Sequence, residues 1–325
     1  GRPKGVMVSH KNLANYLDHS KRYLKNDMDC AVVSTAMTFD ATVTSLWAPL
    51  SVGMSIELVP QDDKLIERLA DFISDDEDRL LFKLTPSHLS ALLGCHLLEG
   101  SRSIQHVFVI GGEKLSTELL ARWQQLFPNA TFINEYGPTE TTVGSSTFEV
   151  NSSNSVEGKW LSVPIGLPIG NTELLVLDEA LNLVPSGVPG DLFIAGEGVS
   201  QGYINDPIRT ASSFIPNPYS NAPGKVMYRT GDIVRWLPDG NLDFIGRNDD
   251  QVKIRGFRIE LAEIEIQLKA IAECKQCVVL AMGCSEEQKH LVAFMLRAAN
   301  STASCAALPS VEELKARLAR HLPSY

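Results

Sequence analysis

Two hydrophobic periods alternate along the first 150 residues. Short apolar runs predict buried strands at 31–37, 54–59, 105–110 and 130–135. Between these runs, apolar residues recur at helical spacing over 41–51, 62–74 and 116–127, and Thr85-Pro86-Ser87 is typical of the start of a further helix. Because strands and helices alternate, residues 1–150 are predicted to form an α/β layer with a mostly parallel sheet.

The pattern changes near residue 150. After a polar loop at 151–159, short apolar segments between Gly and Pro residues predict strands at 172–178, 191–195, 226–236 and 242–245. This spacing is typical of an antiparallel, β-rich part, which we assign to residues 151–248.

A third pattern begins at Asp249. It predicts strand, helix, strand, strand and helix at 251–259, 260–272, 276–282, 290–297 and 310–320. The segment 298–309 is predicted to be a loop or linker. Residues 249–325 are therefore predicted to form a small α+β lobe beside the larger part of 1–248.

Composition places the chain among ordinary globular proteins. Its 325 residues are 44% hydrophobic and 21% charged, which excludes collagen, low-complexity disorder and a disulfide scaffold. This length predicts two or three domains or lobes. No apolar run reaches the roughly 18 residues that a membrane span needs. The net charge of −10 disfavours a nucleic-acid surface, which is usually basic.

The six cysteines are sparse and have no secretion signal beside them. This usage is typical of reduced thiols, and we expect a cytoplasmic location. Cys274-x-x-Cys277 with Cys284 gives three thiols without a fourth ligand, which favours a structural role over zinc binding.

Two segments carry residues that suit a nucleotide. Gly1-Arg2-Pro3-Lys4-Gly5 combines backbone N–H groups with a lysine charge, although it lacks the GxxxxGK[ST] pattern. Asn134-Glu135-Tyr136-Gly137-Pro138-Thr139-Glu140-Thr141-Thr142 ends a predicted strand, where ligands of α/β sheets bind. There Tyr136 offers a stacking face, Thr139 a hydroxyl and Glu140 a hard oxygen for Mg²⁺. Each segment alone also suits an ordinary turn.

Two further segments follow in the β-rich part and at its end. In Tyr228-Arg229-Thr230-Gly231-Asp232, an aspartate after a glycine turn could accept two hydroxyl hydrogen bonds from a ribose. The charged run from Gly246 to Glu260 lies where two lobes are predicted to join, which suits a hinge. Alone, the first is also an ordinary turn and the second a solvated hairpin.

The four segments, in this order, resemble the adenylation domains of non-ribosomal peptide synthetases, within the adenylate-forming (AMP-binding) enzyme superfamily. Phe39-Asp40-Ala41 and the glycine-rich run from Gly190 to Tyr203 extend the resemblance. It implies the adenylate-forming fold, an α/β fold with a partial large N-terminal lobe, including the β-rich subdomain, over 1–248. A small, truncated lid subdomain would follow over 249–325, with Asp249 as the hinge.

The resemblance also implies an enzyme, an ATP-dependent amino-acid adenylating ligase. Such a domain forms aminoacyl-AMP from Mg·ATP and an amino acid, and passes the acyl group to the phosphopantetheine thiol of a carrier domain. The implied partners are the carrier and condensation domains of the same synthetase. The need for a small activator protein stays open.

Residue by residue, the resemblance implies an ATP-binding set made of Gly111, Gly112, Glu113, Asn134, Tyr136, Gly137, Thr139, Asp232 and Arg247. Tyr136 would stack on adenine. Lys4 belongs to the phosphate loop, Thr139 contacts the α-phosphate, and Glu140 holds Mg²⁺. Together with Gly256, from the loop that swings in for thiolation, these last three are the implied catalytic residues.

The family's substrate pocket corresponds here to Asp40, Ala41, Thr44, Lys83, Val109, Gly111, Glu135, Val143 and Gly144. Asp40 would pair with the α-ammonium of an amino acid. Lys83 and Glu135 would place a donor and an acceptor in a small pocket, which fits the side-chain amide of asparagine. Glutamine, one methylene longer, is the runner-up.

The first and last residues suggest a fragment of a longer protein. The chain begins inside a loop at Gly1 and stops at Tyr325, directly after a helical pattern. We expect it to be weakly active or inactive alone, because half of the phosphate loop and the family's catalytic lysine would lie outside it. Two alternatives stay open: an acyl- or aryl-CoA ligase, which Asp40 disfavours, and an inert fragment that serves as an interaction scaffold.

Overall fold

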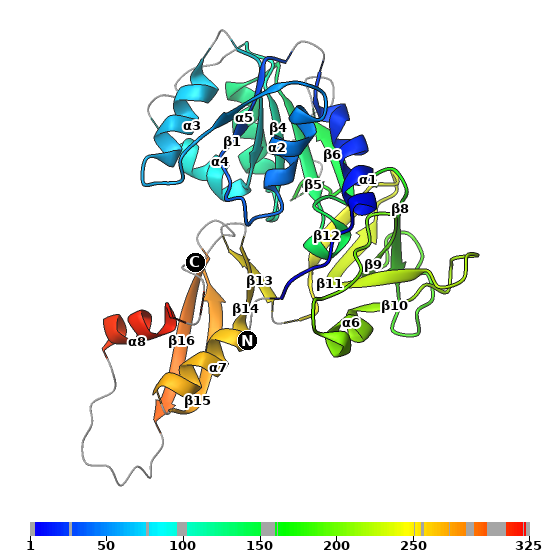
Figure 1. Ribbon diagram of the computed structural model, residues 1–325, viewed down its shortest axis with the longest axis vertical. Coiled ribbons are helices and arrows are strands. Elements are labelled where there is room, and N and C mark those ends of the chain that lie inside the picture. The colour runs from blue at the N-terminus through cyan, green and yellow to red at the C-terminus, as the bar shows by residue number, and fades with distance from the viewer. Residues whose placement is uncertain are drawn as a thin grey trace. The chain divides into compact units, whose positions relative to one another are not determined.

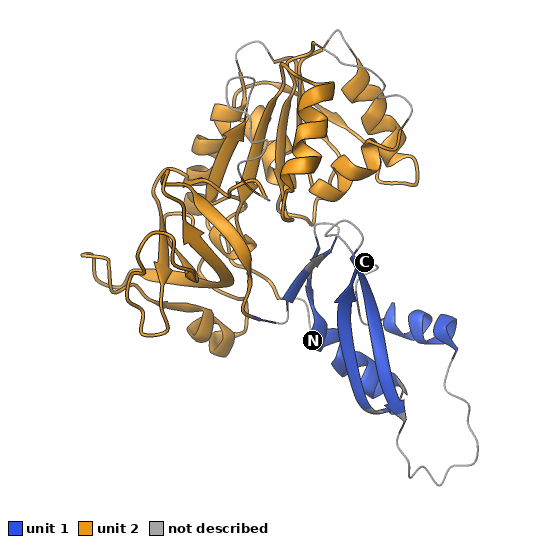
Figure 2. Ribbon diagram, turned by 180° about the vertical axis from the view of Figure 1, so that it is seen from behind, with its two compact units in different colours: residues 1–3, 249–325 blue, residues 4–248 orange. Residues whose placement is uncertain are grey.

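The computed structural model divides into two compact units, Lys4–Asn248 and Asp249–Tyr325, the second taken together with Gly1–Pro3 (Figure 2). The residues that the structure describes are 4–25, 28–75, 78–95, 103–150, 160, 162–249, 251–254, 257–272, 274–283, 289–297, 310–320 and 322. The predicted loops at 151–159 and 298–309, and Gly256, lie outside these residues.

A seven-stranded sheet forms the first layer of the large unit, in the order β2-β1-β3-β4-β5-β6-β7 (Figure 1). Its first five strands along the chain pair in parallel, β6 pairs antiparallel with β5, and β7 pairs antiparallel with β6. The strands are β1 (Cys30–Val33), β2 (Ser55–Leu58), β3 (Leu80–Leu84), β4 (Val107–Gly111), β5 (Thr131–Tyr136), β6 (Ser146–Val150) and β7 (Leu167–Pro168). β7 lies beyond the predicted change at residue 150, so the first sheet extends into the part assigned as β-rich.

The helices of this layer are α1 (His10–Ser20), η1 (Lys21–Tyr23), α2 (Thr42–Leu50), α3 (Leu65–Ser74), α4 (Pro86–Leu92), α5 (Thr117–Leu126) and η3 (Thr139–Thr141). α4 begins as Thr85-Pro86 predicts: Thr85 caps the backbone N–H of His88, and Pro86 fills the first turn. α1 was not predicted, although Ser9 and Asn12 form a reciprocal capping box at its start.

The two faces of the parallel sheet carry different side chains. Phe82, Phe108 and Phe132 are register neighbours on β3, β4 and β5, and their rings stack with centroids 5.4 and 5.2 Å apart. Helices α3, α4 and α5 bury this face in the largest apolar cluster (Figure 1). Because side chains alternate along a strand, Lys83 and Glu135 point to the opposite face.

A second sheet of five antiparallel strands completes the large unit. Its elements are β8 (Thr172–Leu177), β9 (Gly190–Gly196), α6 (Pro207–Ser213), β10 (Phe214–Pro216), β11 (Val226–Trp236) and β12 (Leu242–Arg247). The four predicted strands correspond to β8, β9, β11 and β12. α6 was missed because its seven residues make less than two helical turns. β10 was missed because three residues are too few to show a strand pattern.

Among its described residues, the small unit contains two antiparallel strand pairs and two helices. They are β13 (Gln251–Ile254), β14 (Phe257–Glu260), α7 (Leu261–Ala272), β15 (Cys274–Met282), β16 (His290–Arg297) and α8 (Val311–Leu318). The single strand predicted at 251–259 is wrong. Gln251 pairs with Glu260 and Ile254 with Phe257, so this segment is an antiparallel pair. Because β-forming residues run through this whole segment, the sequence pattern did not indicate that the chain reverses between the two strands.

Candidate functional site

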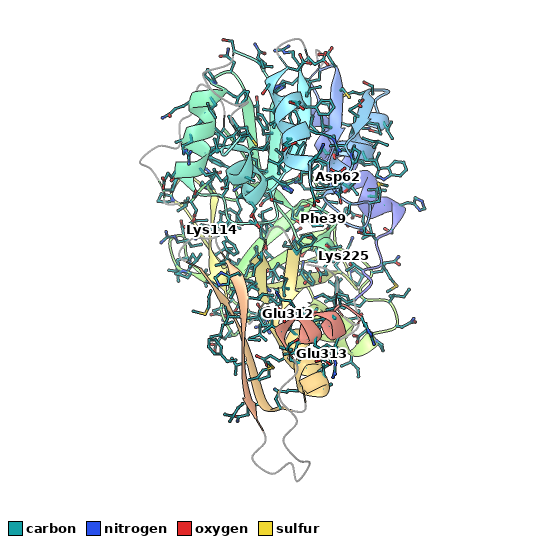
Figure 3. The ribbon with its side chains drawn as sticks, turned by 90° about the vertical axis from the view of Figure 1, so that its left-hand side faces the viewer. Phe39, Asp62, Lys114, Lys225, Glu312 and Glu313 are labelled. Atoms are coloured by element: carbon teal, nitrogen blue, oxygen red, sulfur yellow. The ribbon has the colours of Figure 1, made fainter. Side chains whose placement is uncertain are left out.

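Three of the predicted motifs follow strands of the parallel sheet at its carboxyl edge. The Phe39-Asp40-Ala41 motif follows β1, Gly112 and Glu113 follow β4, and Thr139 follows β5. Phe39, the first residue of its motif, and Lys114, which directly follows Glu113, lie toward the same edge of this layer (Figure 3). Ligands of open α/β sheets bind at this edge.

Lys83 and Glu135 form a buried ion pair through Nζ and Oε2. The two residues are only 5% and 3% exposed. Glycine is required on both sides of the pair. A Cβ at position 111 would lie 2.6 Å from the Glu135 carbonyl oxygen and 3.1 Å from Lys83 Nζ, and one at Gly144 would lie 2.7 Å from Glu135 Cδ.

Two tyrosines that the sequence did not suggest complete this cluster. The hydroxyls of Tyr16 and Tyr23 donate to Glu135 Oε1 over 2.9 and 2.7 Å. Tyr16 also contacts Thr44 Oγ1 at 2.5 Å. Burial raises the pKa of Glu135, but Lys83 and the two hydroxyls more than offset it, so the net pKa is lowered. The spacing of Leu13, Tyr16 and Leu17 was the signal that could have revealed α1 and its buried face.

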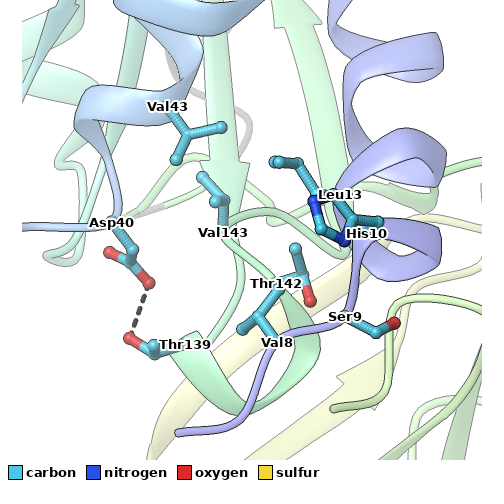
Figure 4. Close-up of a pocket in the computed structure, with 9 residues that line it drawn as sticks. All are labelled: Val8, Ser9, His10, Leu13, Asp40, Val43, Thr139, Thr142 and Val143. Atoms are coloured by element: carbon cyan, nitrogen blue, oxygen red, sulfur yellow. Dashed lines mark hydrogen bonds between the residues drawn. The ribbon is translucent and has the colours of Figure 1, made fainter. Parts of the chain in front are cut away.

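A pocket of about 290 Å³ lies beside this cluster (Figure 4). It is lined by Val8, Ser9, His10, Leu13, Asp40, Val43, Thr139, Thr142 and Val143. Thr139 Oγ1 donates to Asp40 Oδ2 over 2.5 Å across its mouth. Of the predicted substrate residues, Asp40 and Val143 line this pocket. Lys83 and Glu135 are not among its lining residues, and Tyr16, which donates to Glu135, packs against Val143 and Val43 of the pocket wall.

The remaining predicted substrate residues lie in the elements around the pair. Ala41 caps the start of α2, and Thr44 is buried in its first turn. Val109 is fully buried on β4, in register with Lys83 on β3. The structure therefore places Val109, Lys83, Gly111 and Glu135 on the sheet face that α1 and α2 cover, and Thr44 on α2 itself.

Glu140 is 1% exposed and accepts a hydrogen bond from the Tyr203 hydroxyl, 2.7 Å from Oε1. Lys4 Nζ lies 3.6 Å from the same oxygen. Backbone hydrogen bonds bring the segments of Lys4 and Tyr203 together. Met7 N donates to Gly202 O over 2.9 Å, and Ile204 N donates to Gly5 O over 2.8 Å. Burial, and then the Glu140 charge, raises the pKa of Tyr203, which therefore remains a donor.

Tyr136, Asp232 and Arg247 form one chain of contacts, although 96 residues separate the first two. The Tyr136 hydroxyl donates to Asp232 Oδ2, and Arg247 donates to Oδ1 and, over 3.1 Å, to the Thr230 carbonyl. Asp232 and Arg247 face each other across β11 and β12. Burial, and then the Asp232 charge, raises the pKa of Tyr136 well above its usual range.

Two other predicted nucleotide residues, Asn134 and Glu113, make contacts within the protein. The Asn134 amide donates to the carbonyls of Val163 and Pro164, over 3.2 and 2.8 Å, so it ties β5 to that segment. Glu113 accepts from Ser87 N and Oγ at the start of α4. Gly137 follows β5. These contacts hold the loops in place, and the nucleotide roles stay predictions.

The described residues show no cluster of three or more His, Cys, Asp and Glu side chains suited to a metal ion. Within them, no helix combines the length and apolarity of a bilayer span. Asp249 is the first residue of the small unit, and its predicted role as a hinge is not tested by these contacts.

The AMP-binding enzyme family matches residues 1–204. Because this match covers more than half of the 325 residues, the chain belongs to the AMP-binding enzyme family. The predicted resemblance to adenylation domains of non-ribosomal peptide synthetases is confirmed by its relatives. Over its whole length, the chain is 38% identical to tyrocidine synthase 3 of Brevibacillus parabrevis and 39% identical to malpibaldin synthetase of Mortierella alpina. It spans only 5% and 6% of those proteins.

Solved adenylation domains confirm the predicted fold class. AlmE of Vibrio cholerae, in complex with glycyl-adenosine-5′-phosphate, matches with a TM-score of 0.84 and 26% identity over 99% of this chain. NpsA-ThdA, an artificially fused adenylation–PCP di-domain from Klebsiella oxytoca, matches with a TM-score of 0.81 and 27% identity over the same share. The chain spans 59% and 61% of these structures.

Proposed function

We propose that the chain is the amino-acid-activating part of a non-ribosomal peptide synthetase and that its substrate is asparagine. A carboxylate oxygen of the amino acid attacks the α-phosphorus of ATP. The bond between that phosphorus and the bridging oxygen breaks, which gives aminoacyl-AMP and pyrophosphate. The buried pair of Lys83 and Glu135 behind a pocket lined by Asp40 is the observation that carries this proposal.

Asp40 is proposed to bind the α-ammonium of the substrate. It lines the pocket, and its carboxylate already accepts the Thr139 hydroxyl. Burial raises the pKa of Asp40 above its ordinary value of 3.8, although Thr139 and Lys83 act in the opposite direction. An ammonium partner would compensate for the partly buried charge, which favours an amino acid over an acyl or aryl acid.

As the pH is lowered, we expect the affinity for the amino acid to decrease at a higher pH than it would if Asp40 had the pKa of an exposed aspartate. The raised pKa means that protonated Asp40 stabilises the fold fully below pH 3.8, and that this contribution is lost as the pH rises through the folded-state pKa. Only the ionised form attracts the ammonium. The measurement is KM for asparagine between about pH 5 and 8 in the complete synthetase. Asp40→Asn should bind weakly with a flat profile, and an identical slope in both proteins would contradict the assignment.

The proposed side-chain specificity depends on Lys83 and Glu135. The C=O of a primary amide can accept from Lys83, and its NH₂ can donate to Glu135. A substrate carboxylate would bring like charge to Glu135, which costs several kcal/mol when desolvated. Because Lys83 and Glu135 already pair with each other, neither charge would be without a partner when an apolar substrate binds. Its disadvantage is the loss of the two hydrogen bonds that the amide would make.

Glu135→Gln should lower the preference for asparagine over aspartate by about 1–3 kcal/mol, the usual scale of a charged hydrogen bond. The new amide can donate to a substrate carboxylate and removes the like charge. The measurement is pyrophosphate exchange by the complete synthetase with asparagine, aspartate and leucine. Glu118→Gln, an exposed change on α5, is the matched control. An unchanged ratio, or a wild type that prefers leucine, would refute this proposed specificity.

The nucleotide is proposed to bind along the loops at the carboxyl edge. Asp232 would take the ribose hydroxyls, with Arg247 and Tyr136 holding its carboxylate in place. Thr139 and Lys4 would contact phosphate oxygens, and their side chains reach Asp40 and Glu140 respectively. Gly111, Gly112, Glu113, Asn134 and Gly137 would shape the floor beneath it.

Glu140 fits the binding of Mg²⁺ together with ATP. Magnesium is commonly held by one or two carboxylates and the substrate's phosphates, and keeps several waters. A single buried carboxylate, fixed by Tyr203 and Lys4, matches this donor set. The ion would neutralise charge on the phosphates, while Lys4 and Thr139 orient them.

The aminoacyl group is proposed to pass to a phosphopantetheine thiol, which releases AMP. The titles of neighbouring structures support a carrier partner, since NpsA-ThdA is an adenylation–PCP di-domain. Condensation domains would be further partners, and an activator protein is compatible with this arrangement. Gly256 would act in this second step, after rotation about Asp249. Transfer of labelled asparagine to a carrier domain tests it.

A further inference from the structure

The hydrogen atoms around Glu135 can be assigned by counting. An ionised carboxylate only accepts hydrogen bonds. Tyr16 and Tyr23 must therefore each donate their single hydroxyl hydrogen to Oε1. Tyr16 then has no hydrogen left for Thr44, 2.5 Å away. Thr44 must therefore donate, and the hydrogen bonds run from Thr44 to Tyr16 to Glu135.

This assignment uses most of the carboxylate's capacity. Each carboxylate oxygen has about two lone-pair sites. Oε1 accepts from both tyrosines, and Oε2 accepts from Lys83. Oε1 is therefore filled, and one acceptor site remains at Oε2, directly beside Lys83 Nζ.

We propose that Tyr16 and Tyr23 are positioning residues for specificity, which fill Oε1 so that a substrate can reach Glu135 only at Oε2, beside Lys83. The inference rests on the proposed activation of asparagine. A carboxamide presents one acceptor and one donor on the same carbon, which suits the Lys83 ammonium and the neighbouring Oε2. A carboxylate presents two acceptors and meets only one donor.

The position of Tyr16 connects this cluster to the pocket. Tyr16 is fully buried and packs against Val43 and Val143, which line the pocket. Its hydroxyl continues to Glu135 on β5. Tyr16 therefore contacts the pocket wall through its ring and Glu135 through its hydroxyl, so it links the pocket to the ion pair.

Lys83, and after it the hydroxyls of Tyr23 and Tyr16, lowers the pKa of Glu135 and so keeps it ionised. Glu135 is faced by Lys83 from β3, by Tyr16 and His19 from α1 and by Tyr23 from η1. His19 lies edge-on to Tyr23 at 5.5 Å, and burial lowers its pKa, so it is neutral near pH 7. A protonated Glu135 could donate to a substrate carboxylate. Removing either hydroxyl should therefore admit aspartate, and more so at lower pH.

The test uses Tyr16→Phe and Tyr23→Phe in the complete synthetase. Pyrophosphate exchange is measured with asparagine and aspartate at pH 6, 7 and 8. We expect the ratio of kcat/KM for asparagine over aspartate to fall about three- to tenfold for each lost hydroxyl, with the larger fall at pH 6. Titration of Asp40 affects both substrates alike and cancels in this ratio. Tyr219→Phe, which removes an exposed hydroxyl bonded to the Leu181 carbonyl over 2.7 Å, should leave the ratio unchanged.

The outcomes separate this inference from the proposed function. A wild type without asparagine-dependent exchange would overturn the proposed function itself. A wild type that prefers asparagine, with the same ratio in both phenylalanine variants at every pH, would overturn only the role of the tyrosines. If one phenylalanine variant unfolds at lower urea than wild type, the other decides the test, because each removes one donor from Oε1. A lowered ratio then supports the inference, and an unchanged ratio overturns it.

Discussion

Replacing Lys83 with methionine should lower the free energy of unfolding by about 3–5 kcal/mol, the usual effect of removing one partner of a buried ion pair. Glu135 would then be a charge at 3% exposure, with only the hydroxyls of Tyr16 and Tyr23 as donors. Methionine keeps the length of the lysine stem, so the cavity effect is small. Urea unfolding, followed by tryptophan fluorescence, measures the change as a lower midpoint at a constant slope.

Two further variants separate the buried charge from the lost side chain. Lys83→Met with Glu135→Gln should recover much of the stability, because the glutamine is neutral and still accepts from the tyrosines. Lys11→Met removes the same side chain from an exposed pair with Glu197, where Lys11 is 74% exposed, and should change stability by at most about 1 kcal/mol. Equal losses in Lys11→Met and Lys83→Met would show that burial of the pair is irrelevant.

Much of the large unit follows from hydrophobic period alone. The apolar runs of β1, β4 and β5 are flanked by helices at the expected places, and period-two alternation places Glu135 on the same face as Ile133. β3 (Leu80–Leu84) was not predicted, although its five residues are all buried. Lys83 interrupts the apolar run of this strand, so the pattern typical of a buried central parallel strand is broken.

The partners of the site residues could not be read from the sequence. Tyr23 and Glu135 are 112 residues apart, and only the packing of α1 and η1 on the sheet brings them together. Asp232 was selected for its turn, but its contact with Arg247 follows from the pairing of β11 with β12. Local pattern therefore indicated which groups could act. The tertiary fold determined which groups meet.

Glu140→Gln should reduce pyrophosphate exchange by the complete synthetase about 10²–10³-fold, mainly in kcat. Charge stabilisation by a metal ion contributes several kcal/mol, and each 1.36 kcal/mol is a factor of about ten in rate. Glutamine keeps the shape and still accepts from Tyr203, so the fold around the 2.7 Å hydrogen bond is preserved. The activity of the variant should also need more Mg²⁺ to reach half of its maximum.

The comparison with Tyr203→Phe tells a metal ligand from a structural residue. This variant keeps the Glu140 carboxylate and removes only the hydrogen bond that orients it, for which about a 10–100-fold loss is typical. Raised Mg²⁺ should partly restore Tyr203→Phe, because the ligand is still present, and should restore Glu140→Gln much less. Glu118→Gln, exposed on α5, should behave as wild type. If Glu140→Gln and wild type show the same Mg²⁺ dependence, Glu140 does not hold the ion, and its buried carboxylate serves only to anchor Lys4 and Tyr203.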